Sequence, residues 1–212
     1  MLREESASRG RPRDLAKREA IVDAGRALFA AGGTRQVTVG QVLSRACVSR
    51  GTFYANFADT DALLEAVVWR ESDRIVAGAV SSNAGKEQLR SVLLRFGIGL
   101  LTFLCDPEMQ SFEQRLTAEA DTNPELARRF FEAGPSRAHR CLISVVKTAI
   151  ERGELVSGNA AELVGDLIGL WQGFHRLELM FRVVPFPTPA QLEQRSARGV
   201  DLFLKLYGRN AR

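Results

Sequence analysis

A chain of 212 residues in which 45% are hydrophobic and 25% are charged has the composition of a globular protein, which excludes a disordered or fibrous one. The net charge of +4 is unevenly placed: residues 1–56 hold ten Lys or Arg and five Asp or Glu, so the N-terminal end favours a polyanionic partner. No apolar run approaches the roughly 20 residues of a membrane-spanning helix, no signal peptide is recognisable, and three scattered Cys are typical of a reducing compartment, so we expect a cytoplasmic protein without a membrane partner.

Residues 1–12 form a basic N-terminal arm in this interpretation. The run Arg9-Gly10-Arg11-Pro12-Arg13 is similar to the core of a minor-groove AT-hook. Gly and Pro keep such a segment extended and thin, so that Arg side chains can lie in the narrow, electronegative groove of A·T-rich DNA. The sequence therefore predicts that Arg11 contacts DNA. The alternative is a solvated tail.

Helical periodicity and capping residues continue through the chain, with no strand alternation. Asn123, Asn159 and Thr188 each precede a segment as a cap, and Pro follows two of them at the first helical position. The sequence therefore predicts an all-α fold of about nine helices. The expected segments are 13–32, 39–46, 50–56, 60–81, 86–105, 107–120, 124–152 with a break at Gly134-Pro135, 160–182 and 189–207.

The stretch 38–57 fits two short helices joined by a tight turn. Thr38 can cap the first helix and Ser49 the second, which leaves Cys47 and Val48 as the turn. In a helix-turn-helix unit the first helix braces against the DNA backbone and the second enters the major groove. This pattern predicts a DNA-reading device.

The second helix of this device carries two aromatic residues four apart, Phe53 and Phe57, which we expect to anchor it in a core. Its polar and basic residues are then left for DNA. The expected DNA-binding residues are Thr38, Ser49, Arg50, Gly51, Thr52, Tyr54 and Asn56, together with Arg11 of the arm.

A specific series of residues surrounds and includes the predicted helix-turn-helix. It consists of Ile21, Ala24, Leu28, Phe29, Gly32, Thr38, Val39, the segment V-S-x-G-T-F-Y from Val48 to Tyr54, Phe57, Leu63 and Leu64. Through this series, residues 18–67 resemble the N-terminal DNA-binding domain of the TetR family of bacterial transcriptional regulators. The resemblance implies a helix-turn-helix domain over residues 13–58 and a helical regulatory, ligand-binding and dimerisation domain over residues 59–212. It also implies a homodimer that binds a palindromic operator in double-stranded DNA, in the bacterial cytoplasm.

Three positions depart from the family pattern. The turn usually carries Gly, which tolerates positive backbone angles that cost other residues about 1 kcal/mol or more, but here it holds Cys47. Leu43 stands where a small residue is usual. Thr60, flanked by Asp59 and Asp61, stands where a Lys commonly contacts phosphate. These departures bear on operator affinity and helix spacing, and they leave the expected fold unchanged.

The C-terminal half resembles one regulatory type within the same family. The resemblance rests on N-P-E-L-A-R-R-F-F at 123–131, on Gly134-Pro135, and on the segment 149–155. It implies dimerisation through the last two helices and a site for an inducer.

The expected helix 160–182 is apolar nearly all round, so it must be buried on two sides. Gly inside a helix costs about 1 kcal/mol relative to Ala, and three Gly at four-residue spacing suggest that another helix passes close by. We expect this stripe to meet the final helix of a second subunit, and the alternative is packing on a helix of the same chain. The dimer candidates are Gly165, Gly169, Gly173, Leu192, Val200 and Phe203.

The regulatory half holds enough aromatic residues to line an apolar cavity, although such residues are also typical of plain core. Polar contacts could come from Glu113, Arg115, His139, His175 and Glu178. No His or Cys pair has metal-ligand spacing, so we expect no metal. The candidate ligand-pocket residues are Trp69, Phe96, Phe103, Phe112, Glu113, Phe131, His139, Trp171 and His175.

Two other functional classes are alternatives to a DNA-binding protein. No phosphate-binding loop, dinucleotide motif or nucleophile motif is present, so an enzyme is the least expected class, with no catalytic residue and no cofactor. A helical adaptor that binds only protein is the other alternative. We expect a sequence-specific transcriptional regulator, a homodimeric repressor that a small hydrophobic inducer releases from its operator.

Overall fold

The computed structural model describes residues 11–32, 36–79 and 88–209. Within these ranges every regular element is a helix, apart from an isolated β-bridge between Leu155 and Gly208, so the all-α prediction is confirmed. The chain divides into two compact units, Met1–Val67 and Val68–Arg212. The division falls inside the helix that begins at Thr60, whereas the sequence placed its domain boundary between residues 58 and 59.

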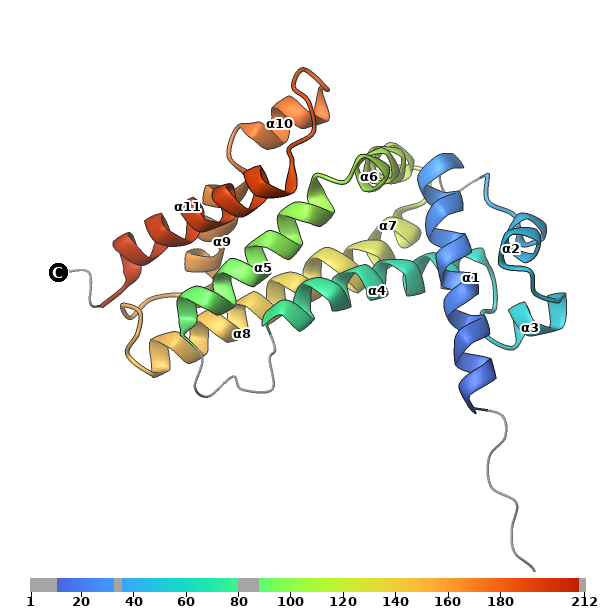
Figure 1. Ribbon diagram of the computed structural model, residues 1–212, viewed down its shortest axis with the longest axis horizontal. Helices are drawn as coiled ribbons and strands as arrows, with labels where there is room; N and C mark the ends of the chain where they lie inside the picture. The colour runs from blue at the N-terminus through green and yellow to red at the C-terminus, as the bar shows by residue number, and fades with distance from the viewer. Residues whose placement is uncertain (1–10, 33–35, 80–87, 210–212) are drawn as a thin grey trace, which may run out of the picture. The chain divides into compact units, whose positions relative to one another are not determined.

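The first unit contains α1 (Arg11–Gly32), α2 (Val39–Ala46), α3 (Arg50–Tyr54) and the beginning of α4 (Thr60–Ala79) (Figure 1). Asp59 begins α4 by accepting a hydrogen bond from the backbone N–H of Ala62 at 2.7 Å, so the acidic residue noted in the sequence is a helix cap. The core of this unit consists of Ile21, Val22, Ala24, Phe29, Ala30, Val37, Val42, Phe53, Phe57, Leu63, Leu64 and Val67.

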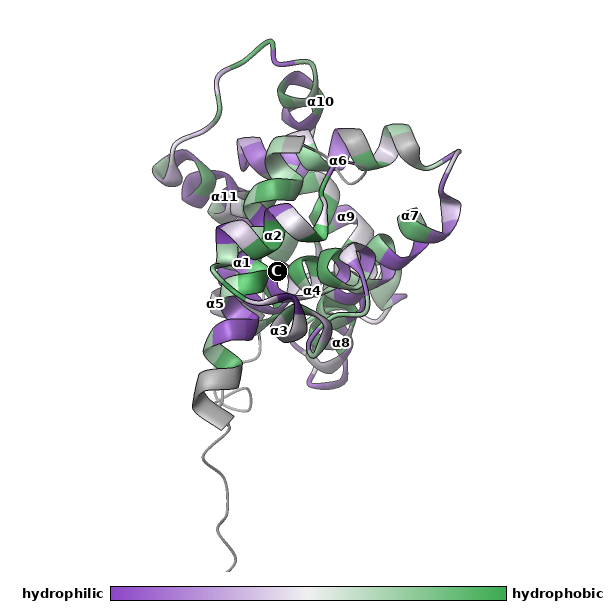
Figure 2. Ribbon diagram, turned by 90° about the vertical axis from the view of Figure 1, so that its right-hand side faces the viewer, coloured by the Kyte–Doolittle hydropathy of each residue, from purple (hydrophilic) through white to green (hydrophobic). Residues whose placement is uncertain are grey.

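The second unit begins with the remainder of α4 and holds the other helices (Figure 1). In Figure 2 most helices carry both hydrophobic (green) and hydrophilic (purple) residues, as expected when one face is buried and the other meets solvent. The further elements are α5 (Leu89–Leu104), α6 (Pro107–Glu119), α7 (Pro124–Phe131), a π-helical turn η1 (Glu132–Ser136), α8 (Arg137–Glu151), α9 (Ala160–Gln172), α10 (His175–Met180) and α11 (Pro189–Tyr207).

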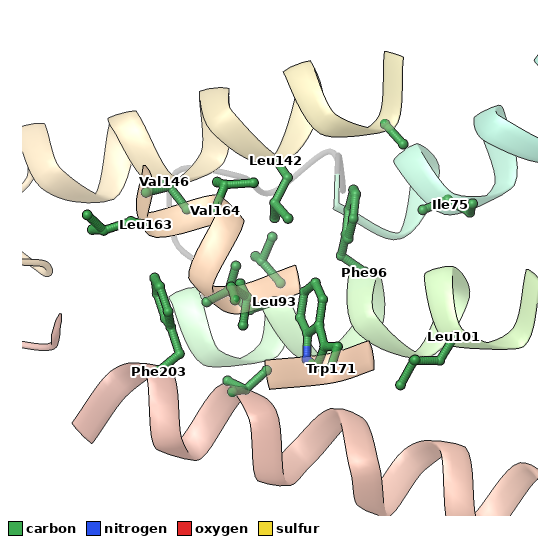
Figure 3. Packing of buried hydrophobic residues seen from close by; sticks show 14 of the residues in the cluster. Ile75, Leu93, Phe96, Leu101, Leu142, Val146, Leu163, Val164, Trp171 and Phe203 are labelled. Carbon is green, nitrogen blue, oxygen red and sulfur yellow. The ribbon is translucent and has the colours of Figure 1, made fainter. Parts of the chain in front are cut away.

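Trp171 of α9 lies at the centre of the second core, where its side chain is fully buried (Figure 3). Its ring stacks on Phe96 of α5 with centroids 6.2 Å apart, and its indole N–H donates to the backbone oxygen of Ser196 in α11 at 3.2 Å. A Cβ atom at Gly97 or Gly199 would lie 2.7 Å or 2.4 Å from the indole. Glycines on α5 and α11 therefore make the space that the indole fills.

The predicted helix 160–182 is two helices, because the chain turns at Gly173. Gly173 has a φ of +49°, which a residue with a Cβ rarely adopts. Arg195 of α11 donates from Nε to the carbonyl oxygen of Trp171 at 2.6 Å and from Nη2 to that of Gln172 at 2.8 Å. These bonds satisfy two of the carbonyl groups that every helix leaves open at its C-terminus. The helical periodicity gave no sign of this partner, which lies on a distant segment.

The break predicted at Gly134-Pro135 is a π-helical turn that joins α7 to α8 without interrupting the helical path. Pro135 lacks a backbone N–H, and a π-bulge is one way in which a helix accommodates such a residue. Gly134 is buried, and a Cβ atom there would lie 2.7 Å from Cγ1 of Val68. The turn therefore packs closely on α4.

Candidate nucleic-acid interface and ligand cavity

The first helix of the helix-turn-helix is fixed by a complete capping box. The Thr38 hydroxyl accepts from the backbone N–H of Gln41 at 3.3 Å, and the Gln41 side chain accepts from the backbone N–H of Thr38 at 2.8 Å. This reciprocal pair satisfies backbone N–H groups that would otherwise be open at the helix start. Thr38 is exposed at this end of α2.

The turn between α2 and α3 contains a left-handed residue at Cys47, with φ of 52° and ψ of 45°. Its backbone N–H donates to the carbonyl oxygen of Leu43, as does that of Val48 at 3.2 Å. The position that usually holds Gly therefore keeps the Gly conformation although its residue is Cys. The substitution adds backbone strain and leaves the turn geometry intact.

The recognition helix α3 is capped by Ser49, whose hydroxyl accepts from the backbone N–H of Thr52 at 3.1 Å. Phe53 is fully buried and Phe57 nearly so, as the sequence predicted. Their burial turns the opposite face outward. On that face Arg50 and Gly51 are exposed, and the Tyr54 side chain is 52% exposed.

Three polar residues predicted to face DNA are partly used in hydrogen bonds within the unit. The Asn56 amide donates from Nδ2 to the carbonyl oxygen of Thr52 at 2.8 Å, which ties down the end of α3. The Ser49 and Thr52 hydroxyls lie 2.9 Å apart in a hydrogen bond. The Asn56 side chain therefore keeps its Oδ1 atom and the second N–H of Nδ2 for DNA.

The predicted extended arm requires a correction at its C-terminal end. Helix α1 begins at Arg11, so the backbone of Arg11 and Pro12 is helical and not extended. Pro is well tolerated in the first turn of a helix, since the missing N–H has no partner there. Residues 1–10 lie outside the described residues.

A cavity of about 260 Å³ lies inside the second unit, with walls from α4, α5, α6, η1, α8, α9 and α10. Its volume is just below the roughly 300 to 1,000 Å³ of most ligand pockets, and like them it is mainly apolar. Its polar lining residues are Ser72, Glu113, His139, Gln172 and Arg176, and its apolar ones are Val68, Ile75, Phe96, Leu100, Phe103, Leu104, Gly134, Pro135, Ala138, Leu142 and Ile168.

Of the predicted pocket residues, Phe96, Phe103, Glu113 and His139 line this cavity. The others lie elsewhere. Trp69 is 48% exposed beneath the guanidinium of Arg137, Phe131 is 55% exposed, and Trp171 fills the core beside the cavity. Phe112 packs on Phe130, and His175 pairs with Glu178 and lines a separate surface hollow.

Sequence reasoning missed three polar residues of the cavity, Ser72, Gln172 and Arg176. Gln172 and Arg176 stand four residues apart at the end of a strongly apolar segment. A polar pair at helical spacing in such a segment was the available signal. Arg176 donates from Nη2 to Oε2 of Glu113 at 2.5 Å, so α10 and α6 are joined at the cavity wall.

Hydrogen bonds and an ion pair connect the part of the cavity wall formed by α4 to the π-helical turn and to the start of α8. The Ser72 hydroxyl donates to the carbonyl oxygen of Gly134 at 3.4 Å, and Arg137 donates to that hydroxyl at 3.3 Å. Arg137 also forms an ion pair with Asp73 and lies over the Trp69 ring at 4.1 Å. These contacts connect the α4 wall of the cavity to the π-helical turn and to the start of α8.

The predicted dimer residues of the final helix require a correction. Leu192, Val200 and Phe203 are buried in the core of their own subunit, where α11 packs against α5 and α9. The apolar residues that α11 exposes are instead Leu202 and Leu206. The error arose because both faces of the helix are partly apolar, and periodicity alone did not tell which face meets the core.

The glycine stripe of α9 separates into two kinds of position. Gly165 and Gly169 are exposed, and within the described chain no atom lies within 4 Å of a Cβ built on either one. The alternative that these two glycines pack on a helix of the same chain is therefore wrong. Gly173 has a different role, since its positive φ ends the helix.

Burial raises the pKa of the Cys105 and Cys141 thiols, which keeps them protonated and unreactive near neutral pH. Cys47 is exposed in the turn of the helix-turn-helix. No helix in the described ranges is long and apolar enough to cross a membrane. Among those residues there is also no cluster of three His, Cys, Asp or Glu side chains suited to a metal ion.

Known proteins share both the sequence pattern and the fold. Residues 91–209 match the family model of the AefR-like transcriptional repressor, C-terminal domain, and residues 21–67 match that of bacterial regulatory proteins, tetR family. The HTH-type transcriptional regulator YvkB of Bacillus subtilis (strain 168) is 27% identical over 187 residues, which cover 87% of this chain and 94% of YvkB.

Two solved structures show the same fold. A TetR-family transcriptional regulator from Mesorhizobium loti MAFF303099 has a TM-score of 0.74 at 24% identity, over 92% of this chain and 98% of that one. The flavonoid-responsive regulator FrrA has a TM-score of 0.67 at 22% identity, with the same coverage. Regulators of this family bind DNA as dimers. With the family models matching both its DNA-reading unit and most of its second unit, the chain belongs to the TetR family and is a helix-turn-helix transcriptional regulator, not an enzyme.

Proposed function

We propose that this regulator is a homodimeric repressor of a palindromic operator, and that a small hydrophobic inducer releases it by filling the cavity of the second unit. The observation that carries the proposal is that a single helix, α4, contributes both to the cavity wall and to the core of the DNA-reading unit. Val68, Ser72 and Ile75 belong to α4, and the same helix supplies Leu63 and Leu64 to the core of the DNA-reading unit.

The exposed face of α3 supports direct reading of DNA. Arg50 is exposed at the first position of the helix. Gly51 is also exposed and lacks a side chain, so the backbone can approach a base edge or phosphate closely. The Tyr54 hydroxyl is suited to a phosphate contact. Phe53 holds this face in position from the core side.

The outward faces of α9 and α11 support a dimer. Gly165 and Gly169 leave the α9 backbone open to a partner, and a surface hollow brings Gly169 together with Leu202 and Arg198 of α11. Small residues permit the close approach of two helices. Burial of the exposed Leu side chains between the two subunits would stabilise the dimer through the hydrophobic effect. A second copy of this face would pack α9 and α11 into a four-helix interface.

The coupling between ligand and DNA follows from the contacts that connect α4 to the π-helical turn at the cavity. A molecule bound in the cavity lies against Ser72 and the π-turn, and it stabilises the arrangement of these walls that fits it best. Gly134 lies against Val68, so a displaced π-turn also moves α4. Two recognition helices must stand about one helical turn of DNA apart, so a small pivot of α4 in each subunit removes the fit.

The name of FrrA says that this relative responds to flavonoids. Flavone, a neutral two-ring-system molecule of that chemical class, is therefore a suitable first probe. An operator is first selected from random duplex DNA, and its affinity for the protein is measured by fluorescence anisotropy with and without saturating flavone. We expect flavone to weaken operator binding by about tenfold or more, a typical allosteric coupling.

Two Ala-to-Phe variants show whether release acts through the cavity. Ala138→Phe fills the cavity from α8, whereas Ala118→Phe adds the same ring at an exposed position of α6. Flavone should release the parent and Ala118→Phe but not Ala138→Phe. Equal release of all three proteins would contradict the proposal that the inducer binds in the cavity. A failure to select any operator would contradict the proposal that the protein is a repressor.

A further inference from the structure

The cavity contains one hydrogen-bond donor that the protein does not use. The Arg176 side chain is 18% exposed, and its Nη1 atom is buried without a hydrogen-bond partner among the described residues. Its Nη2 atom is occupied by Glu113. A buried donor without an acceptor is unfavourable, so a ligand oxygen placed at Nη1 would gain more than an ordinary exposed hydrogen bond.

Two other polar side chains line the cavity in different surroundings, those of Ser72 and Gln172. The Ser72 hydroxyl, on the wall formed by α4, is bonded to the carbonyl oxygen of Gly134 and to Arg137. The Gln172 side chain, at the last position of α9, also lines the cavity. The polar end of the cavity is therefore at the junction of α6, α9 and α10, and the remaining wall is mainly apolar.

The charge of this polar end is already balanced. Arg176 carries one positive charge and Glu113 one negative charge, and their ion pair lies at the cavity wall. A carboxylate bound at the buried Nη1 atom would bring a second negative charge next to Glu113, and like charges repel at close range. A neutral oxygen would accept the same hydrogen bond without that repulsion.

From these observations we propose that the cavity selects a neutral, compact hydrophobic molecule with a single hydrogen-bond acceptor, a carbonyl or hydroxyl oxygen that binds Nη1 of Arg176. The volume of about 260 Å³ restricts the ligand to a small molecule of one or two rings. This inference rests on the proposed inducer site and adds the chemical class of its ligand.

Three compounds with two phenyl rings on one carbon test the proposal. In benzophenone that carbon is the carbon of a neutral carbonyl group. In diphenylmethane it carries no hydrogen-bond acceptor, and in diphenylacetate it carries a carboxylate. Dissociation constants are measured by calorimetry on the full-length protein. We expect benzophenone to bind about tenfold more tightly than diphenylmethane, the ratio expected for one bond to a charged donor, and diphenylacetate to bind most weakly.

Two substitutions at the ion pair should change this order in different ways. Arg176→Met keeps an unbranched apolar stem and removes the guanidinium donor, so the preference for benzophenone over diphenylmethane should disappear. Glu113→Gln leaves Arg176 with an unbalanced positive charge, so diphenylacetate should become the tightest of the three. Arg128→Met and Glu125→Gln alter an exposed ion pair of α7 outside the cavity and should leave the order unchanged. Thermal melting shows whether each variant is folded.

Each outcome has a distinct meaning. If none of the three compounds binds the parent protein while flavone still releases it through the cavity, this inference is overturned and the proposed function stands. If flavone fails as well, the cavity is not an inducer site and the proposed function fails with this inference. If the ketone and the hydrocarbon bind equally, or if Arg176→Met keeps the parent's order, only the role of Arg176 is overturned. Tightest binding of diphenylacetate to the parent would overturn the selection for neutral ligands.

Discussion

Arg195 of α11 holds the end of α9 by donating to the carbonyl oxygens of Trp171, at 2.6 Å, and of Gln172, at 2.8 Å. The Trp171 indole returns a hydrogen bond to α11 at the carbonyl oxygen of Ser196. The two helices are thus joined by polar contacts in both directions, at the point where Gly173 ends α9. This joint positions Gln172 and Arg176 at the cavity.

Replacement of Arg195 should destabilise the second unit. Arg195→Ala removes two charge-assisted hydrogen bonds and leaves the carbonyl groups of Trp171 and Gln172 without their donor, so we expect a loss of about 2 kcal/mol in the free energy of unfolding. Urea denaturation followed by circular dichroism measures it. Lys205→Ala, at an exposed position of the same helix, is the control and should change stability by less than about 0.5 kcal/mol. Equal effects of both changes would contradict the role given to Arg195.

Two glycine substitutions should separate assembly from folding. Gly169→Leu meets open space in its own subunit, so the fold should be kept while the proposed partner helix is pushed away. Sedimentation at micromolar concentration should show monomers, and operator affinity should fall by orders of magnitude because the second half-site is no longer tethered.

The matched change is Gly199→Ala, which places a methyl group 2.4 Å from the Trp171 ring. It should cost about 1 to 3 kcal/mol of stability through overpacking, seen as a lower melting temperature. A stable Gly169→Leu dimer with full operator affinity would show that the interface lies elsewhere.

The recognition helix should contain both a specific and a general contact. Arg50→Ala is expected to cost roughly 1 to 3 kcal/mol at the operator and to relax base preference, because an Arg on a base edge carries sequence information. Tyr54→Phe is expected to weaken binding to all sequences alike, since a phosphate contact carries none. Anisotropy titrations with operator and random duplexes distinguish the two. Equal losses on both duplexes for both variants would refute the assignment.

The strained turn predicts a stabilising substitution. Cys47 has a φ of 52°, which Gly adopts without steric cost, so Cys47→Gly should be about 1 kcal/mol more stable than Cys47→Ala. The comparison with Ala removes the effect of the sulfur atom. Thermal melting of both variants gives the difference, and an equally stable pair would mean that the turn relaxes to another conformation when Cys47 is lost.

Local chemistry in the sequence determined the DNA-reading unit. Thr38 and Ser49 cap their helices through neighbours three residues away, and Phe53 and Phe57 are buried because helical spacing puts them on one face. These interactions connect residues that are close in the chain, so the pattern of the sequence contains them. The positions of α2 and the start of α3 followed directly.

Tertiary structure decided the second unit. Whether Leu192, Val200 and Phe203 or Leu202 and Leu206 face the core depends on where α5 and α9 pass, and no local pattern records that. The end of α9 depends on Arg195, which is more than twenty residues away in the chain. The unused donor of Arg176 likewise exists only because α6 supplies Glu113 for one nitrogen of the guanidinium and the apolar walls offer nothing to the other. Such contacts arise from packing between distant segments, and so only the folded chain reveals them.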